Sequence, residues 1–233
     1  MKNLDIATLR GSLVVSCQAP DGSPLRDAGI IAALAEAAVM AGAVGVRINS
    51  AAHVAAVRDR VNVPIIGLEK VIDAGGAQWI TPTVDDARAL IDAGADIVAL
   101  DATLRTRPGT SGPDVLIPAV RELGAAVMAD IDSFASGKNA GELGAEIVGT
   151  TLSGYTSVPQ NSDGAPDIDL IRALAELPTP VIAEGRIKSP DEVAEAFEAG
   201  AFAVVVGTSI TEPMALTRRF LAATPALTKG SLA

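Results

Sequence analysis

Several short apolar runs in this sequence end at a side chain that can do acid–base chemistry or form hydrogen bonds. The first such side chains after six of these runs are Gln18, Arg47, Glu69 with Lys70, Asp101, Asp130 and Glu184. Runs of small and branched apolar residues are typical of parallel strands buried on both faces, so the first polar residue marks the carboxyl end of each strand. Ligands bind at that end in α/β folds. A base, carboxylic acids and hydrogen-bond donors are therefore expected to meet at one mouth.

Lys70 is the candidate base of this mouth. An amine accepts a proton only in its uncharged form, and the ordinary pKa of lysine is about 10.4. Desolvation and a neighbouring cation lower that pKa, and Arg47 is expected to supply the cation. Glu184 and Asp130 are the candidate acids. Asp101 is interpreted instead as an anchor for a neighbouring turn.

Small residues follow the last two predicted strands. Gly185 and Arg186 come after one of them, and Gly207 and Thr208 come after the other. Glycine allows backbone N–H groups to approach a phosphate closely, with a helix N-terminus behind them. Turn geometry alone would also explain either glycine. Two such turns at the two expected places nevertheless favour a phosphate site built from these four residues.

A phrase built around glycine recurs four times along the chain. Gly42, Gly94, Gly144 and Gly200 each follow a helical pattern and precede an apolar run, at separations of 52, 50 and 56 residues. Each glycine is predicted to end a helix in the left-handed conformation, so that the chain turns directly into a strand. One such interval holds two βα units, and four repeats therefore predict eight units.

The predicted fold is a (β/α)8 TIM barrel that forms a single domain over residues 1–224. Its strands are expected at residues 13–16, 44–46, 64–68, 97–100, 125–129, 146–148, 180–183 and 202–204. A short helix around residues 3–9 precedes the barrel, and residues 225–233 are expected to form a C-terminal tail. A doubly wound open sheet is the alternative, but it would have fewer strands and no fourfold repeat.

Three polar residues are expected to begin helices. Thr83 and Ser189 are both followed by carboxylates in the next turn, where negative charge favours the helix dipole. Asp132 is interpreted in the same way, as an N-cap for the helix that follows it.

Composition excludes several classes of function. A formal net charge of −10 opposes binding to nucleic acid or to an anionic membrane, and an aromatic content of 3% leaves few platforms for base stacking. The only histidine, His53, is expected on a helix surface and cannot build a histidine-rich metal site. The only cysteine, Cys17, is expected to be buried and fits a reducing compartment. The N-terminal residues carry no signal-peptide pattern, so a cytoplasmic location is expected.

A polar turn at residues 150–156 is expected to cover a substrate at the mouth. It carries Ser153 and the only tyrosine, Tyr155, which are both candidate substrate-binding residues. Trp79 is expected in the loop after the third strand, where it either packs or closes over the site.

Several strings of residues together resemble the bacterial N-acetylmannosamine-6-phosphate 2-epimerase family. The likeness covers residues 11–220, nearly the whole chain. The strings are Ser16-Cys17-Gln18, Val46-Arg47-Ile48, Pro64-Ile65-Ile66-Gly67 with Lys70, Gly149-Thr150-Thr151-Leu152-Ser153-Gly154-Tyr155-Thr156 and Ile182-Ala183-Glu184-Gly185-Arg186. The long glycine–threonine string and the Ala-Glu-Gly-Arg string are specific in combination.

This resemblance implies a (β/α)8 enzyme that interconverts N-acetylmannosamine 6-phosphate and N-acetylglucosamine 6-phosphate in sialic-acid catabolism, with no metal and no nucleotide cofactor. It also implies that Lys70 is the acid/base at C2 and that Glu184 is its carboxylate partner. Asp130, Arg47 and Gln18 match active-site positions of the family.

One position departs from the family pattern and leaves other functions open. Glu212 stands where family members often carry an arginine near the phosphate, so recognition of a phosphate would need Arg186 or the backbone to compensate. The alternatives are a Schiff-base aldolase or lyase with Lys70 as nucleophile, and a non-catalytic sugar-phosphate-binding protein. The expected partner in each case is a small sugar phosphate. Alanine-rich helical faces, such as residues 32–38, also leave a homodimer open.

Overall fold

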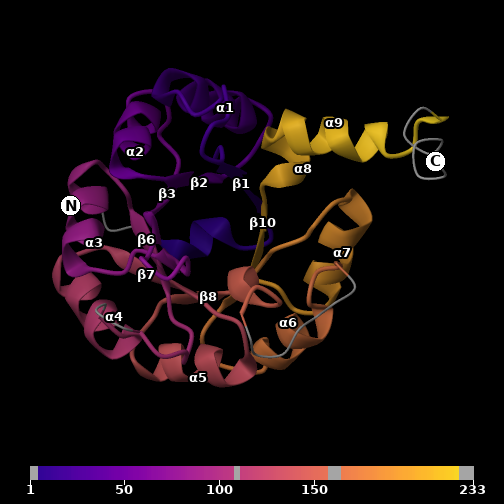
Figure 1. The fold of residues 1–233 in the computed structure, drawn as a ribbon. Coiled ribbons are helices and arrows are strands. Elements are labelled where there is room, and N and C mark those ends of the chain that lie inside the picture. The colour runs from indigo at the N-terminus through magenta and orange to yellow at the C-terminus, as the bar shows by residue number, and fades with distance from the viewer. Residues whose placement is uncertain (1–4, 108–110, 157–163, 226–233) are drawn as a thin grey trace.

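The computed structural model describes residues 5–107, 111–156 and 164–225. Within these residues, eight parallel strands close into a barrel in the spatial order β1-β10-β9-β8-β7-β6-β3-β2 (Figure 1). The strands are β1 (Leu13–Cys17), β2 (Gly45–Asn49), β3 (Ile65–Leu68), β6 (Ile97–Asp101), β7 (Ala126–Asp130), β8 (Ile147–Gly149), β9 (Val181–Glu184) and β10 (Ala203–Val206). The predicted (β/α)8 fold is confirmed. Most strand ends lie within one or two residues of their predicted positions. The predicted tail lies outside the described residues, apart from Pro225.

Helices surround the barrel and connect successive strands (Figure 1). They are α1 (Ala28–Met40), α2 (Ala51–Arg58), α3 (Val84–Asp92), α4 (Pro113–Glu122), α5 (Phe134–Glu142), α6 (Ile168–Leu174) and α7 (Pro190–Glu198). Thr83 and Ser189 cap α3 and α7 with reciprocal capping boxes, as predicted. The interpretation of Asp132 is wrong. Ser133 caps α5, because its hydroxyl accepts the N–H of Ser136.

The four repeated glycines adopt the left-handed conformation that the sequence predicts. Their φ angles are +105° at Gly42, +103° at Gly94, +97° at Gly144 and +100° at Gly200. Each glycine directly follows the C-cap residue of the preceding helix, so the chain reverses without a long loop. These short connections bring each strand back parallel to the one before it.

Two apolar layers form the core. One lies between the strands and the outer helices, and the other fills the barrel interior with residues such as Val14, Ile66 and Met128. The N-terminal segment is a 3-10 helix, η1 (Ile6–Leu9), and its Leu9 is fully buried in the interior layer. Leu9 lies against Gly45, the first residue of β2, so it closes the end of the barrel opposite the strands' carboxyl ends.

A small hairpin interrupts the βα pattern after β3. It consists of β4 (Lys70–Ile72) and β5 (Gln78–Ile80), which pair with each other and form a sheet separate from the barrel. The prediction that Lys70 ends the third strand is therefore wrong, because β3 ends at Leu68 and Lys70 opens the hairpin. Trp79 lies in β5, where it is buried, and so packs within the protein.

The C-terminal elements leave the barrel wall. A short helix, α8 (Thr208–Thr211), follows β10, and α9 (Pro213–Leu221) then projects away from the barrel (Figure 1). No side chain of α9 is buried, and Phe220 and Leu221 are exposed. Among the described helices, none combines the length and the apolar character that crossing a membrane requires.

Candidate active site

A cavity of about 1000 Å³ opens at the carboxyl ends of the barrel strands. The predicted site residues in its lining are Gln18, Arg47, Lys70, Tyr155, Glu184, Gly185, Arg186, Gly207 and Thr208. Strand ends bring these residues together, because side chains that follow parallel strands share one rim. Asp130 and Ser153 are the two predicted site residues that the structure places behind this lining.

Arg47 is the centre of a buried polar cluster at the floor of the cavity. Its Nη2 donates to Oδ2 of Asp130 at 2.5 Å, and its Nη1 donates to Oε2 of Glu184. The Thr151 hydroxyl lies between the two carboxylates, at 2.6 Å from Asp130 Oδ1 and 3.2 Å from Glu184 Oε2. One guanidinium group and one hydroxyl thus fix the positions of two acids.

The two acids of this cluster differ in their access to substrate. Asp130 is completely buried, and burial raises its pKa, although the Arg47 charge opposes that rise. Glu184 lines the cavity and remains partly exposed. Glu184 therefore has access to a ligand that Asp130 lacks.

Lys70 extends from the hairpin into the same cavity. Its side chain contacts solvent, but surrounding protein atoms desolvate it and, together with the Arg47 charge, lower its pKa to about 8. Asp130 and Glu212 act in the opposite direction. The backbone N–H of Lys70 donates to Asn49 Oδ1 at 3.0 Å, which fixes the start of β4 to the end of β2. An amine with this pKa can accept a proton near neutral pH.

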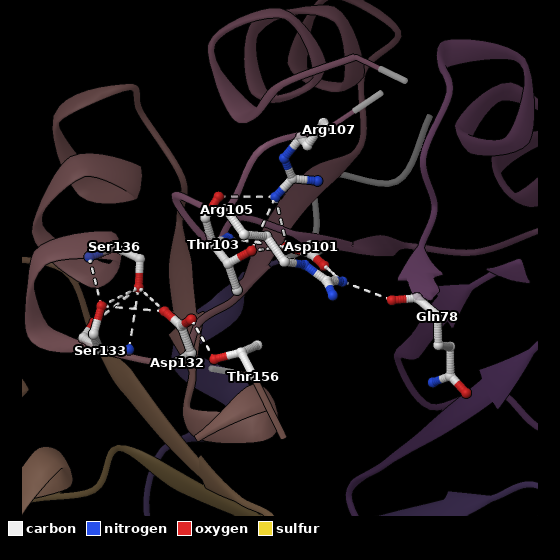
Figure 2. A network of polar contacts seen from close by, with 9 residues as sticks. All are labelled: Gln78, Asp101, Thr103, Arg105, Arg107, Asp132, Ser133, Ser136 and Thr156. Atoms are coloured by element: carbon white, nitrogen blue, oxygen red, sulfur yellow. Dashed lines mark hydrogen bonds and ion pairs between the residues drawn. The ribbon is translucent and has the colours of Figure 1, made fainter. Parts of the chain in front are cut away.

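The turn after β8 forms another wall of the cavity. Tyr155 is exposed and lines it, as expected of a residue that covers a substrate. Ser153 instead points away from the cavity, and its hydroxyl donates to Asp167 at 2.5 Å. Thr156 also lines the cavity and donates to Asp132 Oδ2 at 2.7 Å, a contact visible in Figure 2. Asp132 therefore connects this turn to the end of β7.

The predicted phosphate residues lie together at the β9 and β10 side of the mouth. Gly185 and Arg186 both have positive φ angles, +104° and +61°, so the backbone turns sharply directly after Glu184. Gly207 begins α8 with no side-chain cap. The Arg186 guanidinium is largely committed, because it donates to the carbonyls of Ala165 and Ser153. Lys188 Nζ likewise donates to the carbonyl of Gly164, so backbone groups and the Thr208 hydroxyl remain as partners for an anion in this part of the lining.

The structure tests several interpretations of single residues. Asp101 accepts hydrogen bonds from Thr103, Arg105 and Arg107 and so anchors the turn after β6, as predicted. Cys17 is buried, and burial raises the pKa of its thiol to about 12. His53 lies on α2, half-buried, with its ring nitrogen 2.9 Å from a backbone carbonyl.

Sequence reasoning assigned no role to Thr151 or Asn49. Thr151 lies within a string that was compared only as a motif, and Asn49 ends a strand in the same way as the other rim residues. The position of Asn49 at a strand end could therefore have predicted that it lies at the mouth of the barrel. Among the described residues, no three His, Cys, Asp or Glu side chains gather in a way that could hold a metal ion.

Comparisons with known proteins show which family the chain resembles. Residues 31–226 match the model of the NanE family, described as "Putative N-acetylmannosamine-6-phosphate epimerase". Two proteins named "Putative N-acetylmannosamine-6-phosphate 2-epimerase" are similar to the chain. One, from Synechococcus elongatus, is 52% identical over 87% of this chain and 89% of its own length. The other, from Thermosynechococcus vestitus, is 49% identical over 97% of this chain and 99% of its own length.

A solved structure gives the same result. The N-acetylmannosamine-6-phosphate 2-epimerase from Clostridium perfringens superposes with a TM-score of 0.91 at 34% identity, over 96% of this chain and 98% of that one. The family resemblance inferred from the sequence strings is therefore confirmed. The chain belongs to the NanE family of N-acetylmannosamine-6-phosphate epimerases.

Proposed function

We propose that this protein interconverts N-acetylmannosamine 6-phosphate and N-acetylglucosamine 6-phosphate by moving a proton at C2. One observation carries the proposal: Lys70, with a pKa of about 8, shares a cavity with the partly exposed Glu184. The similar proteins named above support the choice of substrate. A role in sialic-acid catabolism accords with that substrate.

The reaction starts with opening of the sugar ring. A C2 proton is acidic only beside a carbonyl group, and the open-chain aldehyde provides that carbonyl. Glu184 is the acid with access to the cavity, and we assign it the proton transfers at the ring and anomeric oxygens. Arg47 and Thr151 both contact its Oε2 and keep that oxygen in place during the transfers.

Lys70 then removes the C2 proton and leaves an enolate. Return of a proton to the opposite face of C2, from Lys70 after the intermediate rotates or from a second acid, completes the inversion. At neutral pH, a group with a pKa of about 8 is uncharged in roughly one molecule in ten, which is enough for a general base. Gln18 lines the cavity and is our candidate for the donor to the enolate oxygen. Arg47 contributes positive charge near that oxygen, although its terminal nitrogens already contact carboxylates.

Asp130 acts in this scheme by holding Arg47. It lies behind the cavity lining, so its predicted role as a proton donor has less support than a positioning role. Ser153 likewise supports the turn that carries Tyr155. Both remain site residues in the proposal, but neither contacts substrate.

The substrate phosphate binds at the β9 and β10 side of the mouth. Gly185 and Gly207 place backbone N–H groups there without side chains that would block an anion, and Thr208 adds a hydroxyl. Arg186 orders the adjacent turn through its carbonyl contacts. Glu212 lines the same cavity and opposes the anion with its negative charge.

Proton NMR in heavy water tests the proposal directly. N-acetylmannosamine 6-phosphate should be converted to the 2-epimer, and deuterium should appear at C2 of the product and of recovered substrate. The unphosphorylated sugar, measured in parallel, reports how far turnover depends on the phosphate. Conversion with an unlabelled C2 would exclude the enolate route, and binding without conversion would indicate a non-catalytic protein.

Borohydride separates the epimerase from a Schiff-base aldolase. An aldolase that uses Lys70 as nucleophile would be trapped as a covalent adduct when borohydride is added with substrate. The epimerase forms no bond between lysine and sugar, so the mass of the protein should not change.

We further propose that the protein forms a homodimer. The support comes from α9, which projects from the barrel with no buried side chain and exposes Phe220 and Leu221. Exposed apolar side chains on a projecting helix favour packing against a second copy. Light scattering coupled to size-exclusion chromatography gives the mass and decides the question. A cytoplasmic location stays a prediction.

A further inference from the structure

The hairpin that carries Lys70 is separate from the barrel sheet, so other contacts must hold it in place. At its base, Lys70 N–H bonds to Asn49, and Thr81 exchanges hydrogen bonds with Glu69. These contacts fix only the two ends of the hairpin where it joins the barrel. The far strand, β5, needs a further partner, because an isolated two-stranded hairpin is barely stable in water.

Arg105 supplies that partner from the turn after β6. Its Nη2 donates to the backbone carbonyl of Gln78 at 2.6 Å and to Asp101 Oδ2 at 2.5 Å, as Figure 2 shows. Gln78 pairs with Ile72 across the hairpin. Ile72 lies in β4, two residues after Lys70. A single guanidinium group therefore connects the hairpin to the end of a barrel strand.

The same guanidinium also stacks on the hairpin. The Arg105 Cζ lies 3.8 Å from the centroid of the Trp79 ring, which is a close cation–π contact. Trp79 pairs with Val71 across the hairpin, and its Nε1 donates to Asp73 in the hairpin turn at 2.9 Å. The Trp79 indole thus connects Arg105 to β5 directly and to β4 through the pairing with Val71.

Asp101 fixes the orientation of Arg105. Its carboxylate is completely buried and accepts hydrogen bonds from Arg105, Arg107 and the backbone and hydroxyl of Thr103 (Figure 2). A buried carboxylate with this many donors cannot rotate freely, so it holds Arg105 in one geometry.

We propose that Arg105, oriented by Asp101, is a positioning residue that holds the β4–β5 hairpin and thereby places the Lys70 amine for proton transfer. The inference rests on the proposed role of Lys70 in the reaction. Arg105 does not need to touch the reacting atoms, because its hydrogen bond and its ring contact both go to the hairpin. A displacement of about 1 Å at a reacting group lowers a rate by roughly a hundredfold.

Trp79 makes the position of the hairpin measurable without substrate, because it is the only tryptophan in the chain. It is 2% exposed, so acrylamide quenches its fluorescence poorly while the hairpin is held. In Arg105→Met, quenching should increase in the free enzyme. In parallel, kcat should fall by about tenfold to a hundredfold with little change in KM. Arg105→Lys keeps the charge and should restore part of both.

Arg107→Met is the matched control. Arg107 bonds to the same Asp101 carboxylate, but its Nη2 donates to the carbonyl of Thr103 instead of Gln78. Its Cζ also lies farther from the centroid of the Trp79 ring, at 5.1 Å. Arg107→Met should therefore show quenching and kcat values closer to those of the parent enzyme than Arg105→Met does. Thermal unfolding of each variant checks that the barrel is intact. If Arg105→Met fails to fold, the comparison of Arg105→Lys with the parent enzyme decides.

Two results would overturn the inference. A raised KM with unchanged kcat and unchanged quenching in Arg105→Met would make Arg105 a substrate ligand, since it also lines the cavity. Unchanged quenching, kcat and KM in Arg105→Met would exclude any role of Arg105 in the reaction. Lys70→Met separates this inference from the proposed function, because it should abolish exchange at C2 and leave quenching unchanged. If Lys70→Met stays active, the proposed function fails, and the quenching of Arg105→Met still reports on the hairpin.

Discussion

Arg47 and Asp130 form an ion pair beneath the barrel mouth, with 2.5 Å between Nη2 and Oδ2. Their side chains are 1% and 0% exposed, so water cannot compensate either charge. Because Arg47 also bonds to Glu184, this pair couples the stability of the barrel to the position of a proposed catalytic acid. A charge that has lost its partner in such a place is strongly unfavourable.

Replacing Asp130 with alanine should therefore lower the free energy of unfolding by about 3–5 kcal/mol. Urea denaturation measures this change. Arg172→Met is the matched control, because Arg172 pairs with Asp169 on the exposed surface of α6, and its loss should cost less than about 1 kcal/mol. Equal stabilities of the Asp130→Ala variant and the parent protein would show that the buried pair contributes little.

The barrel strands and their connections could be predicted from sequence because their signals are local. Each apolar run marks a strand on its own, and a glycine such as Gly94 marks the end of the preceding helix without reference to distant residues. The β4–β5 hairpin escaped prediction for the opposite reason. Its strands have three residues each, and contacts with Asn49 and Arg105, far away in the sequence, hold it in place.

The candidate site was predictable to the extent that strand ends define a common rim. Arg47, Lys70 and Glu184 line one cavity, as that argument requires. The partners of Arg47 could not be inferred, because they depend on the register of strands on opposite sides of the barrel. For the same reason, the sequence did not distinguish Asp130, which lies behind the cavity lining, from Glu184, which lies in it.

Lys70→Met should abolish deuterium incorporation at C2, because no other lysine lies at the start of the hairpin to accept the proton. The side chain is exposed to the cavity, so the variant should fold and unfold as the parent enzyme does. Proton NMR in heavy water measures the exchange, and circular dichroism checks the fold. Exchange at the parent rate would exclude Lys70 as the base.

The pH dependence of kcat/KM should follow the titration of Lys70. Burial and the Arg47 charge lower its pKa to about 8, so the reactive, uncharged amine increases as the pH rises towards that value and then levels off. Initial rates across this range test the prediction. Lys138→Gln, on the exposed face of α5, should leave the profile unchanged. A midpoint near the ordinary lysine pKa of about 10.4 would contradict the desolvated environment.

Thr151→Val should lower kcat by roughly tenfold to a hundredfold, because a hydrogen bond to a charged group contributes about 1.5–3 kcal/mol. The valine keeps the volume but removes the hydroxyl that contacts both Asp130 and Glu184. Thr151→Ser retains the hydroxyl and serves as the control, with activity near that of the parent. Steady-state kinetics of the two variants decide, and a loss in Thr151→Ser as large as that in Thr151→Val would show that the hydroxyl alone does not account for the effect.

Glu212→Gln should improve recognition of the phosphorylated sugar. Glu212 lines the cavity and is half-buried. Its negative charge therefore repels an anionic substrate, and the nearby solvent weakens that repulsion. Removing a charge of this kind changes an interaction by up to about 1 kcal/mol, which corresponds to a KM about two- to fivefold lower. The gain should shrink as salt is added, because salt screens exposed charges. The KM of the unphosphorylated sugar provides the control and should not change. A higher KM for the phosphorylated sugar would instead mean that the Glu212 carboxylate accepts a hydrogen bond from the substrate.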